Sequence, residues 1–189
     1  MSKENIKSII EFWSPAFLAG LAVYFLCTFG INLVYIPTSS MVPTIRERSM
    51  CITMRMPYLL NRYTLNRGDI VIFNSEEKGK KLCKRVIGLP GDEISFQDGD
   101  VYINGTLYEE PYLAEEHSTF ANKTFKVPEG CFFAMGDNRY HSSDSRVMKN
   151  PYIKSSDIIS RYLFSFRLMK SGFEKSTSAE DSAYLATHK

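Results

Sequence analysis

The sequence predicts a mainly β protein, with an antiparallel β domain that follows one N-terminal membrane-spanning helix. Three observations support this prediction: one long apolar run near the N-terminus, many short apolar runs after it, and Gly- and Asn-containing turn sequences between those short runs. Short runs separated by turn residues are typical of antiparallel strands. Beyond residue 36 the sequence shows no long amphipathic helical pattern.

The N-terminal apolar run extends from Phe12 to Ile36 and contains no charged residue. A run of this length can cross a bilayer as a helix. A cleavable signal peptide is the alternative, but its apolar region usually has only about 7 to 15 residues and ends at small residues. We therefore predict a short N-terminal segment over residues 1–11 and a transmembrane anchor over residues 12–36.

Eight short strands are predicted beyond the anchor. The dipeptide Asn104-Gly105, between two short apolar runs, is the one favoured in two-residue hairpins. The predicted strands are 69–74, 83–87, 93–97, 101–103, 106–108, 125–127, 132–135 and 158–166. Residues 37–169 are predicted to form the folded domain, and residues 170–189, rich in Ser, Thr, Ala, Lys and Glu, a flexible tail.

Composition argues against two classes of partner. The chain of 189 residues has 23 basic and 21 acidic residues without a long run of one sign, so nucleic acid is not expected as a partner. The four cysteines form no CxxC pair and the three histidines lie far apart, so no metal site is expected. Whether a disulfide joins two of Cys51, Cys83 and Cys131 is left open by the sequence.

A cluster of hydroxyl residues follows the apolar run, in Pro37-Thr38-Ser39-Ser40-Met41-Val42-Pro43-Thr44. Two prolines restrict the backbone around this cluster, so the segment can present one hydroxyl rigidly. A Ser/Thr-rich linker leaving the membrane is the alternative. Serine is a poor nucleophile until a nearby base accepts its proton, so a catalytic role requires a base elsewhere in the chain.

Lys84 is the first candidate for that base. Strand alternation places Leu82, Lys84 and Val86 on one face, so the amine is expected between apolar neighbours. Burial disfavours the ammonium form, so the pKa of such a lysine can fall below its usual value of about 10.4 and the amine can act as a base near neutrality. A solvated surface lysine beside Arg85 is the alternative.

The third candidate element is the polar segment Gly136-Asp137-Asn138-Arg139-Tyr140-His141-Ser142-Ser143-Asp144-Ser145-Arg146. Asp144 and Arg146 are suited to form an ion pair, and Ser142 is suited to orient a lysine. A hydrogen-bonded surface turn is the alternative. A triad of Ser40, His141 and Asp144 is a further possibility, although His141 and Asp144 would share one short turn, which is an awkward geometry for orienting the imidazole.

In this order, the segments resemble the type I signal peptidase family of Ser/Lys serine proteases. The resemblance covers about 110 residues and rests on four segments: Ser-Ser-Met-Val-Pro-Thr at 39–44, Arg-Gly-Asp-Ile-Val-Ile-Phe at 67–73, Lys-Arg-Val-Ile-Gly-Leu-Pro-Gly-Asp at 84–92, and Gly-Asp-Asn-Arg with Ser-x-Asp-Ser-Arg at 136–146. It implies a signal-peptidase-like antiparallel β catalytic domain with a short β insertion at about 98–126.

The resemblance also implies roles for individual residues. Ser40 would be the nucleophile and Lys84 the general base. The oxyanion hole would be formed by the hydroxyl of Thr38 and the backbone N–H of Ser40. Met41 would lie on an apolar surface near the membrane. The supporting residues would be Ser142, Asp144 and Arg146.

The implied activity is removal of signal peptides from exported preproteins, bound extended along a strand edge and cut after small residues of the Ala-x-Ala type. The expected partners are preprotein signal peptides and membrane lipid, and the family requires no metal or cofactor. The expected location is the cell inner (plasma) membrane, with a single span and the catalytic domain on the extracytoplasmic side.

Three departures from the family pattern leave alternatives open. Tyr140-His141 stands where Asp-Asn is more frequent, residues 147–151 replace a Gly-rich stretch, and residues 158–161 lack the Gly-Lys often found near this end. A specialised paralogue that matures pilin or conjugation-system proteins is therefore an alternative. A catalytically silent, peptide-binding relative is another, although the presence of both Ser40 and Lys84 argues against it.

Overall fold

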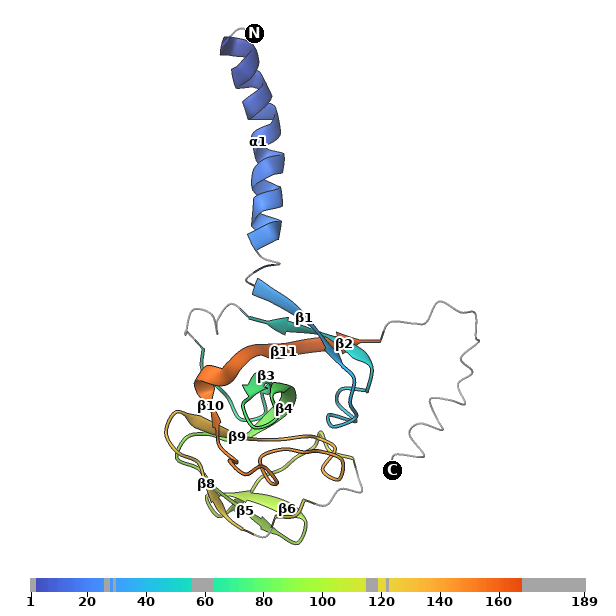
Figure 1. Cartoon of the computed structure of the whole chain (residues 1–189), viewed down its shortest axis with the longest axis vertical. Helices are drawn as coiled ribbons and strands as arrows, with labels where there is room; N and C mark the ends of the chain where they lie inside the picture. Colours follow the sequence, from blue (N-terminus) through green and yellow to red (C-terminus); the bar gives the residue numbers. More distant parts are fainter. Residues whose placement is uncertain are drawn as a thin grey trace, which may run out of the picture.

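Two antiparallel β-sheets and one N-terminal helix form the structure, a computed structural model that describes residues 3–25, 28, 30–55, 63–114, 119–121 and 123–167. Figure 1 shows helix α1 projecting away from the sheets. The elements are α1 (Lys3–Phe25), β1 (Ile31–Ile36), β2 (Ser49–Met54), β3 (Ile70–Ser75), β4 (Lys80–Gly88), β5 (Glu93–Gln97), β6 (Asp100–Ile103), β7 (Thr106–Leu107), β8 (Phe125–Lys126), β9 (Cys131–Met135), β10 (Ile153–Lys154), a 3-10 turn (Ser155–Asp157) and β11 (Ile158–Phe166).

The N-terminal helix covers only part of the predicted anchor. Residues 31–36, predicted as helix, instead form β1, which pairs with β2 from Ile31 opposite Met54 to Ile36 opposite Ser49. The prediction of one continuous helix over 12–36 is therefore wrong at its C-terminal end. Alternate side chains of β1 differ in exposure, as expected of a strand with one face toward the domain. No helix among the described residues has the length and apolar content that a membrane span requires.

The larger sheet has seven strands in the order β1-β2-β11-β3-β4-β9-β10, and every neighbouring pair is antiparallel. Its buried side chains come mainly from β3, β4 and β9, whose sequences are almost continuously apolar. The predictions for 69–74, 83–87, 132–135 and 158–166 are confirmed as β3, β4, β9 and β11. Strands β2 and β10 have no counterpart in the predictions.

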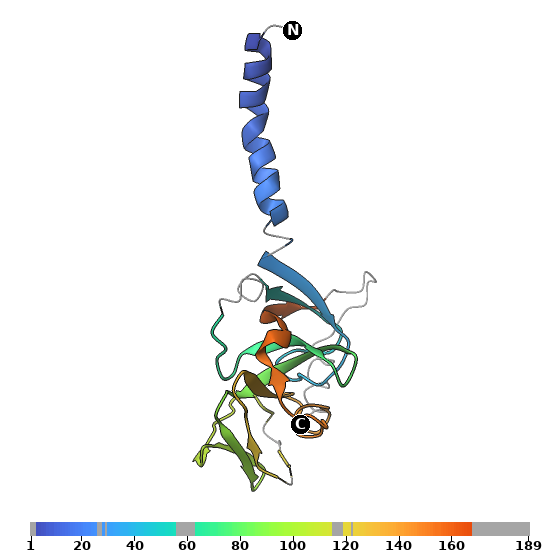
Figure 2. The same cartoon turned by 60° about the vertical axis from the view of Figure 1, so that its left-hand side comes forward.

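The smaller sheet has four strands in the order β7-β6-β5-β8, and Figure 2 shows it at the end of the domain opposite α1. Two hairpins join β5 to β6 and β6 to β7, each through two residues with positive φ: Asp98 at 54° and Gly99 at 90°, then Asn104 at 53° and Gly105 at 79°. Two positive φ values define the turn type that the Asn-Gly sequence favours. The sheet includes β5, so it begins before the insertion predicted at about 98–126.

Three of the four cysteines lie in the described part of the chain, and all three, Cys51, Cys83 and Cys131, are free thiols. This answers the question of pairing that the sequence left open. The predicted flexible tail over residues 170–189 lies outside the described residues.

Candidate active site

Ser40 and Lys84, separated by 44 positions in the sequence, meet in the structure. Ser40 lies in a tight turn after β1, where the N–H of Val42 donates to the carbonyl of Ser39 and the N–H of Ile45 donates to that of Met41. Lys84 extends from β4, and its Nζ lies 2.6 Å from Ser40 Oγ. The two residues that the sequence singled out as nucleophile and base are therefore in direct hydrogen-bond contact.

The turn that carries Ser40 is anchored by the side chain of Met41. Met41 is completely buried and packs with Ile36, Ile45 and Cys51. The expectation that Met41 lies on an exposed apolar surface is therefore wrong. Met41 thus packs into the domain core, while the neighbouring residue Ser40 makes its contact with Lys84.

The environment of Lys84 favours the neutral amine. Its side chain is buried, as strand alternation predicted, with the residue only 3% exposed. Burial lowers the pKa of Lys84 below its ordinary value, although the nearby carboxylate of Asp144 acts in the opposite direction. A buried lysine with a lowered pKa and a hydroxyl within hydrogen-bond distance has the properties of a general base.

Asp144 and Arg146 form the predicted ion pair. Arg146 donates two hydrogen bonds to the Asp144 carboxylate, from Nε to Oδ1 and from Nη2 to Oδ2, both at 2.9 Å. The N–H of Gly136 donates to the same carboxylate at 3.0 Å. Burial alone would raise the pKa of Asp144, but the hydrogen bonds and the charge of Arg146 lower it overall. The Asp144 carboxylate therefore stays ionised near Lys84, with the opposing charge of Arg146 beside it.

Ser142 does not make the expected contact with Lys84. Its Oγ is buried and has no hydrogen bond of good geometry among the described residues, although it helps to lower the pKa of the neighbouring Asp144 carboxyl.

The position of Ser142 also explains why residue 136 is glycine. A Cβ at Gly136 would lie 2.2 Å from Ser142 Oγ and 2.5 Å from the carbonyl oxygen of Ser40, far closer than atoms can approach. The absence of a side chain at residue 136 lets these two segments pack together.

Thr38 lies beside Ser40, with its Oγ1 3.5 Å from Ser40 Oγ. Its side chain is exposed and free to face a bound ligand. A hydroxyl in this position can donate to an oxygen that develops negative charge on the atom attacked by Ser40.

An open cleft of about 520 Å³ contains the Ser40–Lys84 pair. Residues of β1 and of the first half of β4 line this cleft. The outer edge of β1 has no strand partner in the described sheet, and the first half of β4 is unpaired on one edge because β9 pairs with β4 only from Arg85 onward. Two unpaired strand edges therefore border the cleft. The residues lining it are Val34, Tyr35, Ile36, Pro37, Thr38, Ser40, Ile72, Lys78, Lys80, Lys81, Leu82, Cys83, Lys84, His141 and Ser143.

His141, the alternative base, also lines this cleft, but its contacts differ from those of a catalytic triad. Its Nδ1 lies 3.3 Å from Asn138 Oδ1. The well-formed hydrogen bonds to the Asp144 carboxylate come from Gly136 and Arg146. The described residues therefore bring Lys84, and not a carboxylate-oriented histidine, to Ser40.

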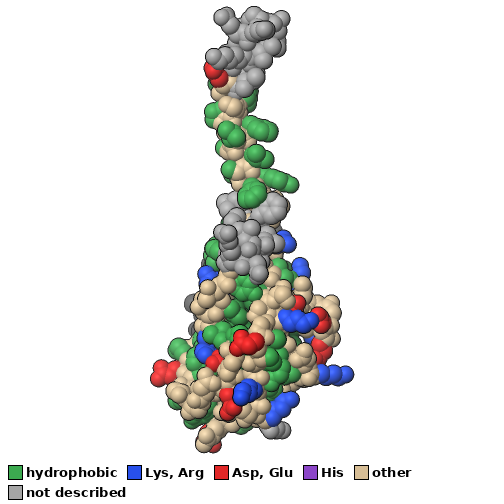
Figure 3. Space-filling model, turned by 90° about the vertical axis from the view of Figure 1, so that its left-hand side faces the viewer, with side chains coloured by type: hydrophobic (Ala, Val, Ile, Leu, Met, Phe, Trp, Pro, Cys, Tyr) green, Lys and Arg blue, Asp and Glu red, His purple; other side chains and the backbone are tan. Residues whose placement is uncertain are grey.

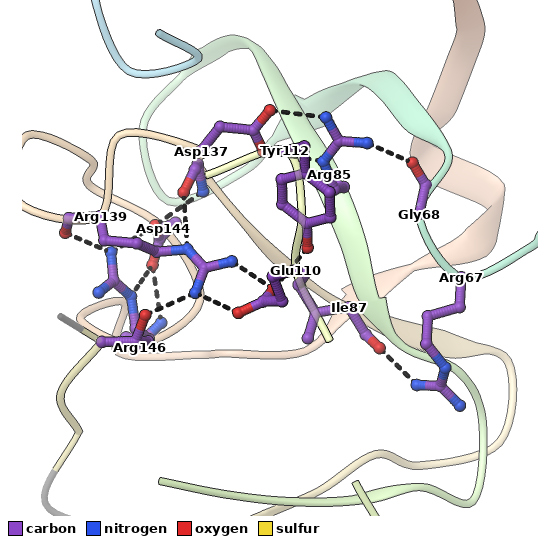
Figure 4. Close-up of polar contacts among 12 residues, drawn as sticks. Arg67, Gly68, Arg85, Ile87, Glu110, Tyr112, Asp137, Arg139, Asp144 and Arg146 are labelled. Atoms are coloured by element: carbon purple, nitrogen blue, oxygen red, sulfur yellow. Dashed lines mark hydrogen bonds and ion pairs between the residues drawn. The ribbon is translucent and has the colours of Figure 1, made fainter. Parts of the chain in front are cut away.

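A second buried ion pair, between Arg85 and Asp137, lies next to Lys84 and was not predicted from the sequence. Arg85 donates from Nε and Nη2 to the two Asp137 oxygens at 2.9 and 2.7 Å. Thr44 also donates to Asp137. Figure 4 shows that Asp137 belongs to a wider network that includes Glu110 and Tyr112. In the sequence, Asp137 could have been recognised from its place in the polar segment 136–146, whereas no pattern pointed to Glu110 or Tyr112 as site residues.

Comparisons with known proteins show which family this chain is similar to. Residues 9–167 match the family model described as signal peptidase, peptidase S26. The chain is 38% identical over 152 residues to signal peptidase I P of Bacillus subtilis subsp. natto, covering 74% of this chain and 80% of that protein. It is 35% identical over 161 residues to signal peptidase I S of Bacillus subtilis strain 168, covering 77% and 84%. A solved signal peptidase I from Enterococcus faecalis V583 aligns with 30% identity and a TM-score of 0.46, covering 52% of this chain and 97% of that chain.

Proposed function

The chain belongs to the signal peptidase family, peptidase S26, and from this membership we propose that it is a serine endopeptidase that removes signal peptides from exported preproteins by a Ser/Lys mechanism. The observation that carries the proposal is the 2.6 Å contact between Ser40 Oγ and the buried Nζ of Lys84. A serine hydroxyl next to a neutral amine is an activated nucleophile.

The reaction begins when the neutral amine of Lys84 accepts the proton of the Ser40 hydroxyl and Ser40 Oγ attacks the scissile carbonyl carbon. The Lys84 ammonium then gives its proton to the leaving amine, which departs and leaves an ester between Ser40 and the signal peptide. Water attacks this ester with Lys84 again acting as the base. The second step releases the signal peptide and restores the Ser40 hydroxyl.

The tetrahedral intermediates carry a negative oxygen that needs hydrogen-bond donors. The proposed donors are the Thr38 hydroxyl, 3.5 Å from Ser40 Oγ, and the backbone N–H of Ser40. Donors already in place cost no reorganisation when the charge develops, and each contributes about 10²- to 10³-fold to the rate in known enzymes. Thr38 and Ser40 together form the proposed oxyanion hole.

The substrate is proposed to bind as an extended strand in the cleft. The outer edge of β1 and the first half of β4 both present unpaired backbone groups there, which an added strand can satisfy. Side chains of alternate substrate residues point to the same side of such a strand. This spacing suits recognition of two small residues separated by one, the Ala-x-Ala type of signal.

We also infer that the protein works at a membrane surface, with the catalytic domain on the extracytoplasmic side where exported preproteins arrive. Figure 3 shows hydrophobic side chains projecting along the described part of α1. Contiguous exposed apolar surface of this kind is typical of sites that bind membranes or other proteins. The exposed apolar side chains include Leu33 and Tyr35 of β1, Phe164 and Phe166 of β11, and, on α1, Phe12, Trp13, Phe17, Leu18, Leu21, Val23, Tyr24 and Phe25.

The test is cleavage of a synthetic preprotein whose signal ends in Ala-x-Ala, by the full chain mixed with phospholipid vesicles. We expect wild type to cut after the second Ala and Ser40→Ala to be slower by at least about 10³-fold, because the nucleophile is missing. Flotation of the same mixture reports whether the chain binds the vesicles. A wild-type chain that cuts pilin-type substrates alone would favour the specialised paralogue, and one that binds peptides without cutting any would favour the silent relative.

The pH dependence of cleavage is expected to follow the loss of one proton from Lys84. Because burial lowers the pKa of Lys84, the amine becomes available as a base at a pH below the usual value of about 10.4. We therefore expect kcat/KM to rise with pH, with an apparent pKa below that value, and then to level off. A pH–rate profile of wild type measures this. A rate that rises only above pH of about 10 would contradict a buried base.

A further inference from the structure

The segment that follows β7 of the smaller sheet reaches Arg139, in the polar segment 136–146. The chain leaves β7 after Leu107, and we call residues 108–113, which follow, the Glu110 strap. The Glu110 carboxylate accepts two hydrogen bonds from Arg139, at 2.8 Å from Nη1 and 2.5 Å from Nη2. The side chains of Arg139 and Glu110 are only 1% and 4% exposed. A fully paired and buried contact of this kind fixes the relative position of the two segments.

The same strap holds a second arginine through Tyr112. The guanidinium of Arg85 lies over the Tyr112 ring, 3.7 Å from its centre. The Tyr112 hydroxyl in turn donates to Glu110 Oε1. Figure 4 shows Glu110 and Tyr112 between the two arginines. Stacking of a guanidinium on an aromatic face restricts its orientation as well as its position.

Both arginines hold the segment 136–139. Arg139 Nε donates to the carbonyl of Gly136 at 3.1 Å, and Arg85 donates to both Asp137 oxygens. That segment contacts the nucleophile turn directly. The N–H of Asn138 donates to the carbonyl of Ser40 at 3.1 Å, and Asn138 Nδ2 donates to the carbonyl of Ser39 at 3.3 Å.

The contacts thus run without a gap from the strap to the nucleophile. Glu110 and Tyr112 position two buried arginines, the arginines position residues 136–139, and Asn138 positions Ser40. Arg85 also follows Lys84 directly on β4, so its orientation constrains the backbone that carries the base. A displacement of about 1 Å between reacting groups can cost about 10²-fold in rate.

We infer that Glu110 and Tyr112 are positioning residues for the peptidase, which hold Ser40 and Lys84 in register through Arg139 and Arg85. This inference rests on the proposed function, because its measurement is the rate of signal peptide cleavage. It differs from a purely structural role, in which loss of the strap would lower stability and leave the folded enzyme fully active.

The test compares four variants with wild type in the preprotein cleavage assay. Glu110→Gln removes the charge that pairs with Arg139, and Tyr112→Leu removes the ring that covers Arg85. Tyr112→Phe is the conservative variant, because it keeps the ring and loses only the hydroxyl. Glu109→Gln is the matched control, since Glu109 is the exposed neighbour of Glu110. Thermal unfolding of each variant identifies an assay temperature at which all the variants and wild type are fully folded.

At that temperature we expect kcat to fall about 10- to 100-fold in Glu110→Gln and Tyr112→Leu, because Ser40 and Lys84 lose their alignment. We expect KM to change by less than about threefold, because the strap does not line the substrate cleft. Tyr112→Phe should retain most of the wild-type kcat. If Glu110→Gln fails to fold, the comparison of Tyr112→Leu with Tyr112→Phe decides the question. A normal kcat in the folded Tyr112→Leu variant, with active wild type, would overturn the inference. Inactive wild type would instead count against the proposed function.

Discussion

Replacement of Lys84 by methionine is expected to reduce signal peptide cleavage by about 10³-fold or more while the fold is retained. Methionine has nearly the length of lysine but cannot accept a proton, so Ser40 loses its proposed base. The site that Lys84 occupies is buried, and an apolar side chain fits it without the cost of burying an ammonium ion. We therefore expect the melting temperature of Lys84→Met to equal or exceed that of wild type.

The measurement is kcat/KM on the Ala-x-Ala preprotein together with thermal unfolding. Lys126→Met, which changes an exposed lysine on β8, is the matched control and should cleave at the wild-type rate. Near-normal cleavage by Lys84→Met, combined with loss of cleavage in His141→Ala, would show that His141 is the base and would rule out the Ser/Lys mechanism.

Replacement of Gly136 by alanine is expected to reduce kcat by about 100-fold or more and to lower stability by about 1–3 kcal/mol. The new Cβ would meet both Ser142 Oγ and the Ser40 carbonyl oxygen at distances that atoms cannot adopt, 2.2 and 2.5 Å. The Ser40 carbonyl belongs to the backbone and cannot rotate away as a side chain can. The turn that carries Ser40 must therefore shift.

Gly105→Ala provides the matched control for Gly136→Ala. Gly105 lies in a hairpin of the smaller sheet with a φ of 79°, and a Cβ at this residue would have no other atom within 4 Å, so alanine there adds backbone strain without a clash. Both variants should lose stability in denaturant unfolding, but only Gly136→Ala should lose kcat at a temperature where both are folded. Equal kcat values for the two variants would show that the close packing at Gly136 does not matter for catalysis.

The parts of the fold that the sequence predicts well are those determined by local chemistry. The hairpin at Asn104 and Gly105 follows from two adjacent residues that accept positive φ. Strand β1 was missed because its residues continue an apolar run that also suits a helix. What makes residues 31–36 a strand is pairing with β2, which lies some 20 positions later in the chain and cannot be recognised from a run of apolar residues alone.

The same distinction applies to the site. Burial of Lys84 follows from strand alternation, and the ion pair of Asp144 with Arg146 joins residues two positions apart. Met41 was placed on the surface, whereas the direction of its side chain depends on how the turn packs over the larger sheet. Glu110 gave no signal because its partner, Arg139, lies 29 positions away and the pairing depends on how the two sheets meet.

Cys83, one residue before the base and among the residues lining the cleft, has a consequence for chemical reactivity. Burial raises the pKa of its thiol to about 12, although Lys84 acts in the opposite direction. The sulfur therefore remains protonated near neutral pH, and alkylating and oxidising reagents act on thiolates. We therefore expect thiol reagents that inactivate cysteine proteases to leave the folded protein active, and to label Cys83 only when the domain unfolds.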